Sequence, residues 1–200
     1  MSFTFRMASS AVIAVLLMAF SAPQERPAPP AYENEPVRFM SDSGYVEFVS
    51  RAPLHEFAGT SQQLSGLIDL ETQILDFFVD LETLDTGNRR RDRDMRRKYL
   101  ETHRFPFAEF TGTFTETVPA SLSERTPVTV QGSFTMREIT HEIQVDGFLT
   151  PEDGGIRVTA SWEILLEDYN IDRPRIVFYE LSDVQRVSID ILLQPVAETP

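Results

Sequence analysis

The 200-residue sequence contains no cysteine, and this absence removes several classes of protein at once. Without cysteine there is no disulfide, no thiol nucleophile and no lipid-modified cysteine to anchor the chain to a membrane. Only three histidines are present, His55, His103 and His141, and none has a second ligand at the spacing of a known metal site. The sequence therefore predicts no metal centre, and its fold has to rest on a hydrophobic core.

Positive charge is also scarce. The chain has 18 Lys and Arg against 31 Asp and Glu, which gives a net charge of -13. This balance disfavours nucleic acid as a partner and disfavours a general attraction to anionic membrane surfaces. Hydrophobic residues make up 42% of the chain and aromatic residues 10%, which suits one domain with a full core.

Catalytic motifs are missing as well. The chain has no Gly-x-Ser-x-Gly elbow. Asp92 and Asp94 are two residues apart and so do not share a helix face, and we expect them to pair with Arg96 and Lys98, four residues further on, rather than to act as an acid/base pair. His141 is most simply a histidine that is satisfied near a turn, with a polar group inside a barrel as the alternative. The sequence thus predicts no catalytic residues and a protein that is not an enzyme.

The first 36 residues are expected to lie outside the folded domain. Residues 1–21 are typical of a signal peptide, because a single charge, Arg6, precedes a mostly apolar run with small residues at its end, and we expect cleavage before Ala22. The run is shorter than the roughly 20 apolar residues that span a bilayer. Five prolines within residues 22–36 predict an extended linker. We therefore expect an exported, periplasmic protein with its domain at residues 37–196; the alternatives are an extracellular protein or one anchored by an uncleaved signal.

Most of the remaining chain alternates between apolar and polar residues with a period of two, which is typical of half-buried strands. The clearest segments are residues 75–81, 128–136, 139–145, 156–166 and 187–193, and the second and third of these form a predicted hairpin. With the weaker segments 45–51 and 64–70, about eight strands are expected. Eight strands in one domain have to close into a barrel or stack as a sandwich, and the pattern alone leaves both open.

One segment breaks this pattern. Residues 89–101 are predicted to form a helix, on which Met95 and Tyr99 lie four residues apart and make a narrow apolar stripe. The segment carries seven basic residues: Arg89, Arg90, Arg91, Arg93, Arg96, Arg97 and Lys98. Three of them crowd the positive end of the helix dipole, at a cost of roughly 0.3 to 1 kcal/mol each. This favours either a solvated basic face or a site that binds an anion.

Short motifs follow one another in a fixed order around this helix and beyond it: Asp85-Thr86-Gly87-Asn88, Arg91-Asp92, Phe105-Pro106 and Phe110, and further along Val130 to Thr135, Ile139 to Ile143, Asp168 to Ile171 and Leu181 to Val184. This ordered set resembles the YceI family of lipid-binding proteins. Asp94 stands where many members carry His. Asn170 replaces a family glycine in a turn and still permits a left-handed backbone. The resemblance covers nearly all of residues 37–195, and it implies an all-β fold: an antiparallel, eight-stranded, lipocalin-like barrel with the helix at about residues 89–101 inserted between strands and covering the barrel.

The resemblance also implies a function. The barrel interior would hold an isoprenoid lipid, such as a polyprenyl phosphate or a quinone, or a similar amphiphile, without a cofactor and without catalysis, as a carrier or store. The residues expected to line such a cavity are Phe77, Val79, Met95, Tyr99, Phe110, Phe114, Phe134, Trp162, Ile164 and Phe178, and Arg89, Arg90 and Arg91 are expected to meet the head group. The alternative is a barrel filled by its own side chains that docks, through its acidic surface and proline-rich tether, to an envelope or membrane complex.

Overall fold

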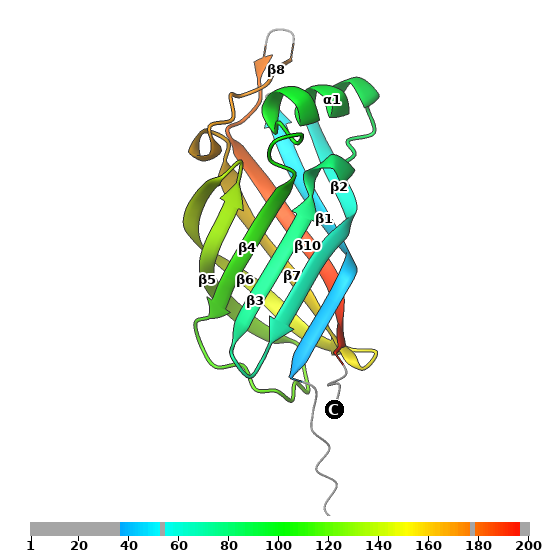
Figure 1. Cartoon of the computed structure of the whole chain (residues 1–200), viewed down its shortest axis with the longest axis vertical. Coiled ribbons are helices and arrows are strands. Elements are labelled where there is room, and N and C mark those ends of the chain that lie inside the picture. The colour runs from blue at the N-terminus through cyan, green and yellow to red at the C-terminus, as the bar shows by residue number, and fades with distance from the viewer. Residues whose placement is uncertain (1–36, 53–54, 177–178, 197–200) are drawn as a thin grey trace, which may run out of the picture. The chain divides into compact units, whose positions relative to one another are not determined.

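The alternating segments form the wall of a closed barrel in a computed structural model, which describes residues 37–52, 55–176 and 179–196 (Figure 1). The strands of the barrel are β1 (Arg38–Ala52), β2 (His55–Asp69), β3 (Ile74–Asp80), β4 (Phe107–Phe114), β5 (Thr126–Met136), β6 (Ile139–Glu152), β7 (Gly155–Leu165) and β10 (Val184–Pro195). They pair antiparallel in the order β1-β10-β7-β6-β5-β4-β3-β2, and β2 pairs with β1 to close the barrel. The expected eight-stranded barrel is confirmed, and the sandwich alternative is wrong.

A helix lies between β3 and β4 and crosses one end of the barrel (Figure 1). After the short 3-10 turn η1 (Leu81–Thr83), α1 (Arg89–Asp94) continues into one π-helical turn, η2 (Met95–Tyr99). We call residues 89–99 the cap helix, the barrel end beneath it the cap end, and the opposite end the closed end. The helix ends at Tyr99, two residues earlier than expected, because Glu101 adopts a left-handed backbone with φ of 50°.

The expected turns have the expected backbone. Arg137 and Glu138, which join β5 to β6, have φ of 52° and 62°, as the tight hairpin between twisted strands requires. Asn170 has φ of 53°, so the left-handed conformation predicted at this position is confirmed. It follows the 3-10 turn η3 (Glu167–Tyr169), and the two-residue strands β8 (Arg175–Ile176) and β9 (Tyr179–Glu180) pair with each other further along the chain.

The seam between β6 and β7 is only partly closed by strand pairing. The paired part of the two strands begins where Gly147 faces Ala160 and continues to the closed end. Within the described residues, the two strands are not paired between Gly147 and the cap end. The turn around η3 packs there instead. Tyr169 is 2% exposed and packs edge-on against the rings of Phe134 and His141, and the His141 Nε2 lies 2.9 Å from the Asp168 carbonyl oxygen. His141 is therefore satisfied by a turn, as expected.

The closed end of the barrel is solid. Ile68, Leu149 and Leu193 are 0% exposed, and the strand ends there pack into one continuous core with Phe39, Leu70, Phe114, Val118, Ile156 and Ile191. The first and last strands also meet at this end, where the Val196 amide donates to the Arg38 carbonyl oxygen at 2.9 Å. The predicted signal peptide and linker, residues 1–36, lie outside the described residues.

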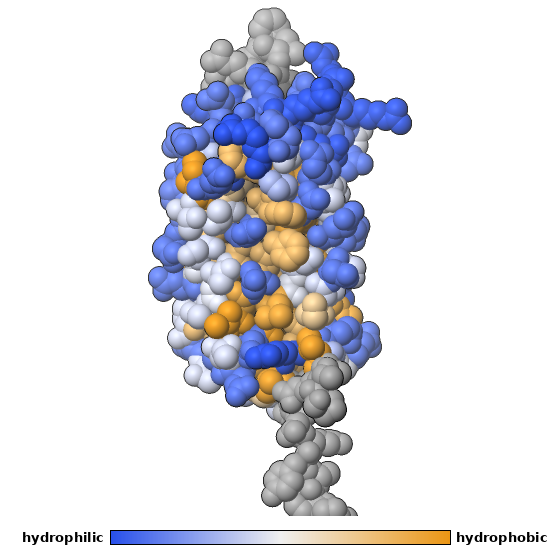
Figure 2. Space-filling view, in the orientation of Figure 1, coloured by the Kyte–Doolittle hydropathy of each residue, from blue (hydrophilic) through white to orange (hydrophobic). Residues whose placement is uncertain are grey.

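Hydrophilic side chains gather at the cap end, whereas apolar side chains reach the surface lower on the wall that faces the viewer in Figure 2. The exposed large apolar side chains of the described residues include Phe78 on β3 and Phe107 on β4, whose rings meet edge-on with their centroids 5.9 Å apart. Both have the outward phase of their strands, because they alternate with the buried residues of those strands.

Candidate ligand-binding site

The half of the barrel nearer the cap end is hollow. A cavity of about 570 Å³ lies inside it, within the 300 to 1,000 Å³ range typical of small-molecule sites. Its wall is mostly aliphatic and aromatic, and Leu149, at the top of the solid core, is part of its floor. Exposed Arg90 and Asp94 also line it, so the cavity reaches the surface beside the cap helix. This arrangement is contrary to a barrel filled by its own side chains.

The depth of the cavity follows from the strand that spans it. Both Leu75, near the start of β3, and Leu81, just past its end, line the cavity. Six residues of a strand cover about 20 Å, and with the usual tilt of barrel strands this corresponds to about 15 Å along the barrel axis. The cavity therefore has the length and the apolar wall that a hydrocarbon chain requires.

The structure places most of the predicted apolar residues in the cavity wall. Eight of them line it: Phe77, Val79, Met95, Tyr99, Phe110, Phe134, Trp162 and Ile164. Phe114 does not, contrary to expectation. It has the inward phase of its strand, but it is the last residue of β4 and is buried in the closed end. Phe178 lies outside the described residues.

The three predicted head-group arginines separate into two groups. Arg90 and Arg91 line the cavity, whereas Arg89 lines a second cleft on the outer side of the cap helix, together with Arg93, Arg96 and Arg97. Arg89 is therefore misplaced in the prediction, because successive residues of a helix point in different directions. The guanidinium of Arg90 has no hydrogen bond or ion pair with any described residue, which leaves it available at the mouth of the cavity.

Arg91 is held in place by its neighbours. The Arg91 Nε donates to the Thr86 Oγ1 at 2.8 Å, and the Arg91 Nη2 donates to the Thr86 carbonyl oxygen at 2.7 Å. The guanidinium carbon of Arg91 lies 4.0 Å from the centre of the Phe57 ring. Both Arg91 and Phe57 line the cavity. A charged group fixed by three contacts is a preorganised part of the mouth.

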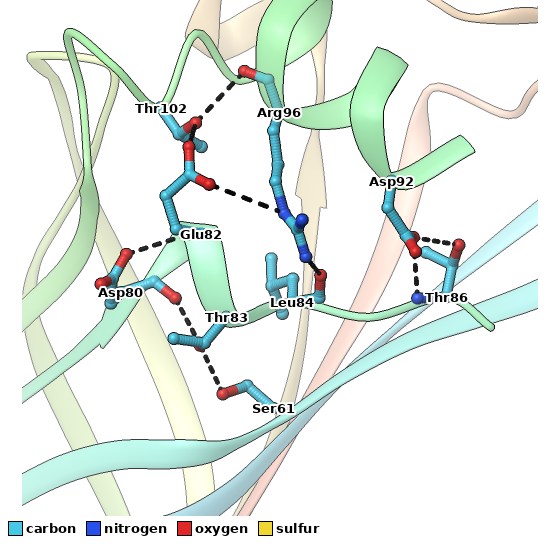
Figure 3. A network of polar contacts seen from close by, with 9 residues as sticks. All are labelled: Ser61, Asp80, Glu82, Thr83, Leu84, Thr86, Asp92, Arg96 and Thr102. Atoms are coloured by element: carbon cyan, nitrogen blue, oxygen red, sulfur yellow. Dashed lines mark hydrogen bonds and ion pairs between the residues drawn. The ribbon is translucent and has the colours of Figure 1, made fainter. Parts of the chain in front are cut away.

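The cap helix is tied to the chain that leads into it. Asp92 is 7% exposed, and its Oδ1 accepts from the Thr86 amide at 2.9 Å and from the Thr86 hydroxyl at 2.5 Å (Figure 3). Asn88 caps the helix by accepting from the Arg90 and Arg91 amides. The expectation that Asp92 pairs with Arg96 is wrong, because the loop folds back and offers Asp92 a closer backbone donor.

Arg96 and Thr102 anchor the other end of the helix (Figure 3). The Arg96 guanidinium donates to the Leu84 carbonyl oxygen at 2.7 Å and lies 3.9 Å from the Glu82 carboxylate, and the Thr102 hydroxyl donates to Glu82. Asp94 lies 3.8 Å from Arg93 and not beside Lys98 as expected. With both ends held, the helix presents Met95 and Tyr99 to the cavity.

On the strands of the barrel, three polar groups of the lining residues were not predicted: the Ser50 hydroxyl, the Gln185 amide and the indole nitrogen of Trp162. Ser50 is 1% exposed and Gln185 5% exposed. The one signal in the sequence was their phase, since Ser50 alternates with Val46 and Phe48, and Gln185 alternates with Val187. A polar residue at an inward position of a strand is unusual, because burial without a partner is unfavourable.

The described residues carry few features of other kinds of site. None of their helices is long and apolar enough to cross a membrane. They contain no cluster of three or more Asp, Glu, His or Cys side chains that could hold a metal ion. Burial raises the pKa of the Tyr169 phenol to about 12, with a smaller contribution from the charge of Asp168, so this group stays neutral.

Comparison with known proteins gives a consistent result. The family model of the YceI-like domain matches residues 39–193. A polyisoprenoid-binding domain from Saccharophagus degradans, implicated in plant cell wall breakdown, superposes with a TM-score of 0.67 at 16% identity, covering 80% of this chain and 99% of that one. BcnA of Burkholderia cenocepacia gives a TM-score of 0.63 at 14% identity over 75% and 95% of the two chains. A YceI protein of Campylobacter jejuni gives a TM-score of 0.50 at 14% identity, covering 94% of this chain and 100% of that one. At these identities the likeness shows the shared barrel fold. None of the curated protein sequences matches the chain.

Proposed function

Because the chain belongs to the YceI-like domain family, we propose that it binds an isoprenoid lipid, such as a polyprenyl phosphate or a quinone, in its barrel and serves as a carrier or store. The observation that supports this most directly is the apolar cavity of about 570 Å³ that opens beside a cationic helix. One of the structurally similar proteins is a polyisoprenoid-binding domain.

The shape of the cavity supports one orientation of the ligand. Its floor at Leu149 is apolar, and its charged lining residues, Arg90, Arg91 and Asp94, all belong to the cap helix. An amphiphile therefore gains most with its tail toward the closed end and its head under the cap helix. Ten buried methylene-sized units would gain about 8 kcal/mol, which has to exceed the cost of association, about 4 kcal/mol or more.

The proposed role involves no chemical step and takes place outside the cytoplasm. The cavity wall is almost entirely apolar, and what it offers a ligand is burial and orientation. The predicted signal peptide at residues 1–21 supports export to the periplasm, where a hydrophobic ligand needs a carrier to cross water.

Native mass spectrometry of the mature protein, purified from its own host, tests the proposal. We expect a stoichiometric lipid that solvent extraction releases and identifies. Protein that emerges empty and also fails to take up added polyprenyl phosphate, quinone or isoprenoid hydrocarbon would contradict lipid binding.

The orientation is tested by a matched pair of variants, with polyprenyl phosphate as the probe. Arg90→Gln removes a free charge at the exposed mouth and should weaken binding about tenfold, which is the lower end of what one hydrogen bond to a charged group contributes. Arg89→Gln makes the same change one residue away, outside the cavity, and should leave binding unchanged. Equal effects of the two variants would place the head group elsewhere.

A further inference from the structure

The segment that contains the cap helix concentrates positive charge. Residues 89–104 hold eight of the 18 Lys and Arg residues and three of the 31 Asp and Glu residues, so their net charge is +5 and that of the rest of the chain is -18. The cap helix crosses the cap end of the barrel, where hydrophilic side chains project from the surface (Figures 1 and 2). An otherwise acidic barrel therefore carries a basic segment at one end.

Three exposed arginines, Arg89, Arg93 and Arg97, follow one another at intervals of four residues and line the cleft on the outer side of the cap helix. We call these three residues the arginine face. Arg89 and Arg97 form no hydrogen bond or ion pair with any described residue, and Arg93 lies 3.8 Å from the neighbouring Asp94. Like charges four residues apart destabilise a helix, so the fold itself gains nothing from this row.

Two acidic residues also line the outer cleft, and both are bound to other partners. Asp92 is 7% exposed and accepts from the Thr86 amide and hydroxyl. Glu82 accepts from the Thr102 hydroxyl and lies 3.9 Å from Arg96, which is not part of the arginine face. A counter-charge for the arginine face therefore has to come from another molecule.

Exposed aromatic rings lie below the arginine face, on the outer wall of the barrel. Phe107 begins β4, three residues after Arg104, and is 42% exposed; Phe78 is 44% exposed and packs edge-on against it. The backbone just before Phe107 is bonded to the turn beneath the cap helix, where the Leu81 amide donates to the Pro106 carbonyl oxygen at 2.8 Å. Basic side chains next to exposed aromatic rings are typical of surfaces that bind the interface of an anionic bilayer.

We propose that the cap end docks on the surface of an anionic lipid bilayer, with the arginine face against the head groups and the rings of Phe78 and Phe107 beside it. An isoprenoid lipid dissolves in a bilayer and not in water. The mouth of the cavity opens beside the same helix, where exposed Arg90 and Asp94 line it, so docking would bring the mouth to the lipid. This inference rests on the proposed function and adds the surface on which the ligand is collected and delivered.

The acidic charge of the rest of the chain orients the docked protein. Three exposed acidic residues, Glu71, Glu116 and Asp153, lie in the connections between strands at the closed end. The cavity alone separates the two ends of the barrel by about 15 Å, whereas exposed charges are screened beyond about 8 Å at physiological salt. The closed end is therefore repelled by an anionic surface without cancelling the attraction of the cap end.

Co-sedimentation of the mature protein with lipid vesicles tests the docking. Vesicles that contain phosphatidylglycerol should bind the protein, vesicles of phosphatidylcholine alone should not, and high salt should release it. Arg89→Gln/Arg97→Gln should weaken binding about 30-fold, because each cation near an anionic surface contributes roughly fivefold. Arg125→Gln/Arg186→Gln makes the same change of charge outside the cap helix and should leave binding unchanged. Equal losses in the two double variants would overturn the arginine face as the docking surface.

A further variant separates a bilayer from other anionic partners. Phe107→Ser removes an exposed ring and no charge, so it should weaken binding to the vesicles and leave the salt dependence unchanged. It should not change the affinity for heparin, a soluble polyanion. Heparin that binds as tightly as the vesicles, together with vesicle binding that Phe107→Ser does not affect, would show a general polyanion site and overturn the bilayer as the partner.

Uptake of a prenylquinone from vesicles connects the docking to the cavity. The wild-type protein should take up the quinone faster from anionic vesicles than from neutral vesicles. Arg89→Gln/Arg97→Gln should lose this difference and keep the wild-type affinity for quinone presented in detergent. Equal rates from both kinds of vesicle in the wild type would overturn the docking. Vesicle binding by a protein that takes up no lipid would instead overturn the proposed function and leave the docking in place.

Discussion

Filling the cavity with a side chain from the wall should abolish ligand binding without unfolding the protein. Ala160 is a suitable position, because it lies on β7, lines the cavity and pairs with Gly147 and Ile189 on the neighbouring strands. Ala160→Phe would direct a ring into a space of about 570 Å³. In a solid core the same change would force neighbours apart and typically cost about 1 to 3 kcal/mol.

The expected magnitudes follow from the area that the new ring buries. Burial of a phenylalanine side chain gains about 1.5 to 3 kcal/mol, and the loss of rotamer freedom offsets part of this, so the free energy of unfolding should stay the same or rise by about 1 kcal/mol. The ring would displace two or three methylene-sized units of ligand. Each is worth about 0.8 kcal/mol, so binding should weaken by about 2 kcal/mol, or roughly 30-fold.

Urea denaturation and lipid titration of the same preparation measure both quantities. Ala58→Phe is the matched control, because Ala58 lies on β2 beside the cavity residue Phe57 but does not line the cavity itself. It should leave lipid affinity unchanged. A loss of stability of more than about 2 kcal/mol in Ala160→Phe would show that the barrel is filled. A stable variant that still binds lipid with full affinity would show that the lipid binds elsewhere.

Four further perturbations test other parts of the structure. Leu149→Ala removes a side chain that is 0% exposed and should lower the free energy of unfolding, measured by urea denaturation, by about 3 kcal/mol. Ile164→Ala lies in the hollow part of the wall and should lower it by less than half as much. Equal losses would contradict a hollow cap end. Asp92→Asn weakens the bonds to Thr86 and should speed hydrogen exchange in the cap helix and lipid release together, while unchanged exchange would show that this contact does not hold the helix. Gly66→Ala places a Cβ 2.3 Å from the Phe77 ring and should push that ring into the cavity and weaken lipid binding, and full affinity would show that the ring moves elsewhere. Because the pKa of the Tyr169 phenol is raised in the folded protein, its contribution to stability is complete below the ordinary pKa of 10.0 and is lost as the pH rises toward about 12. Tyr169→Phe should therefore flatten the dependence of the unfolding free energy on pH in this range. An identical slope in the variant would contradict the assignment.

Strand phase predicted which side chains face inward, and it did so because one face of each barrel strand is buried. It did not predict how far along the barrel each side chain lies. Phe110 and Phe114 have the same phase on β4, yet Phe110 lines the cavity and Phe114 belongs to the closed end. That difference depends on the stagger of neighbouring strands, which is a property of the closed barrel and not of one strand.

The cap helix shows the same limit for charged residues. The run of arginines from Arg89 to Arg91 predicts a basic patch. It does not predict which of these arginines faces the cavity, because that depends on the rotation of the helix about its axis. The structure sets this rotation through Asp92, which turns inward to Thr86. As a result Arg90 and Arg91 face the cavity and Arg89 faces the outer cleft. The i to i+4 rule for Asp92 and Arg96 did not hold, because a loop supplied better partners for both.

The hollow half of the barrel has a physical cause in the pairing of aromatic residues with glycines. Fifteen phenylalanines suggest a filled interior. However, Phe77 lies directly across from Gly66, and Phe48 directly across from Gly59, and an added Cβ at either glycine would lie within 2.3 Å of the facing ring. Each ring therefore lies against the wall, in the space that a side chain on the next strand would otherwise occupy, rather than across the interior. The large side chains therefore lie along the wall and leave the centre of the barrel open. Which ring faces which glycine is determined by the register between neighbouring strands.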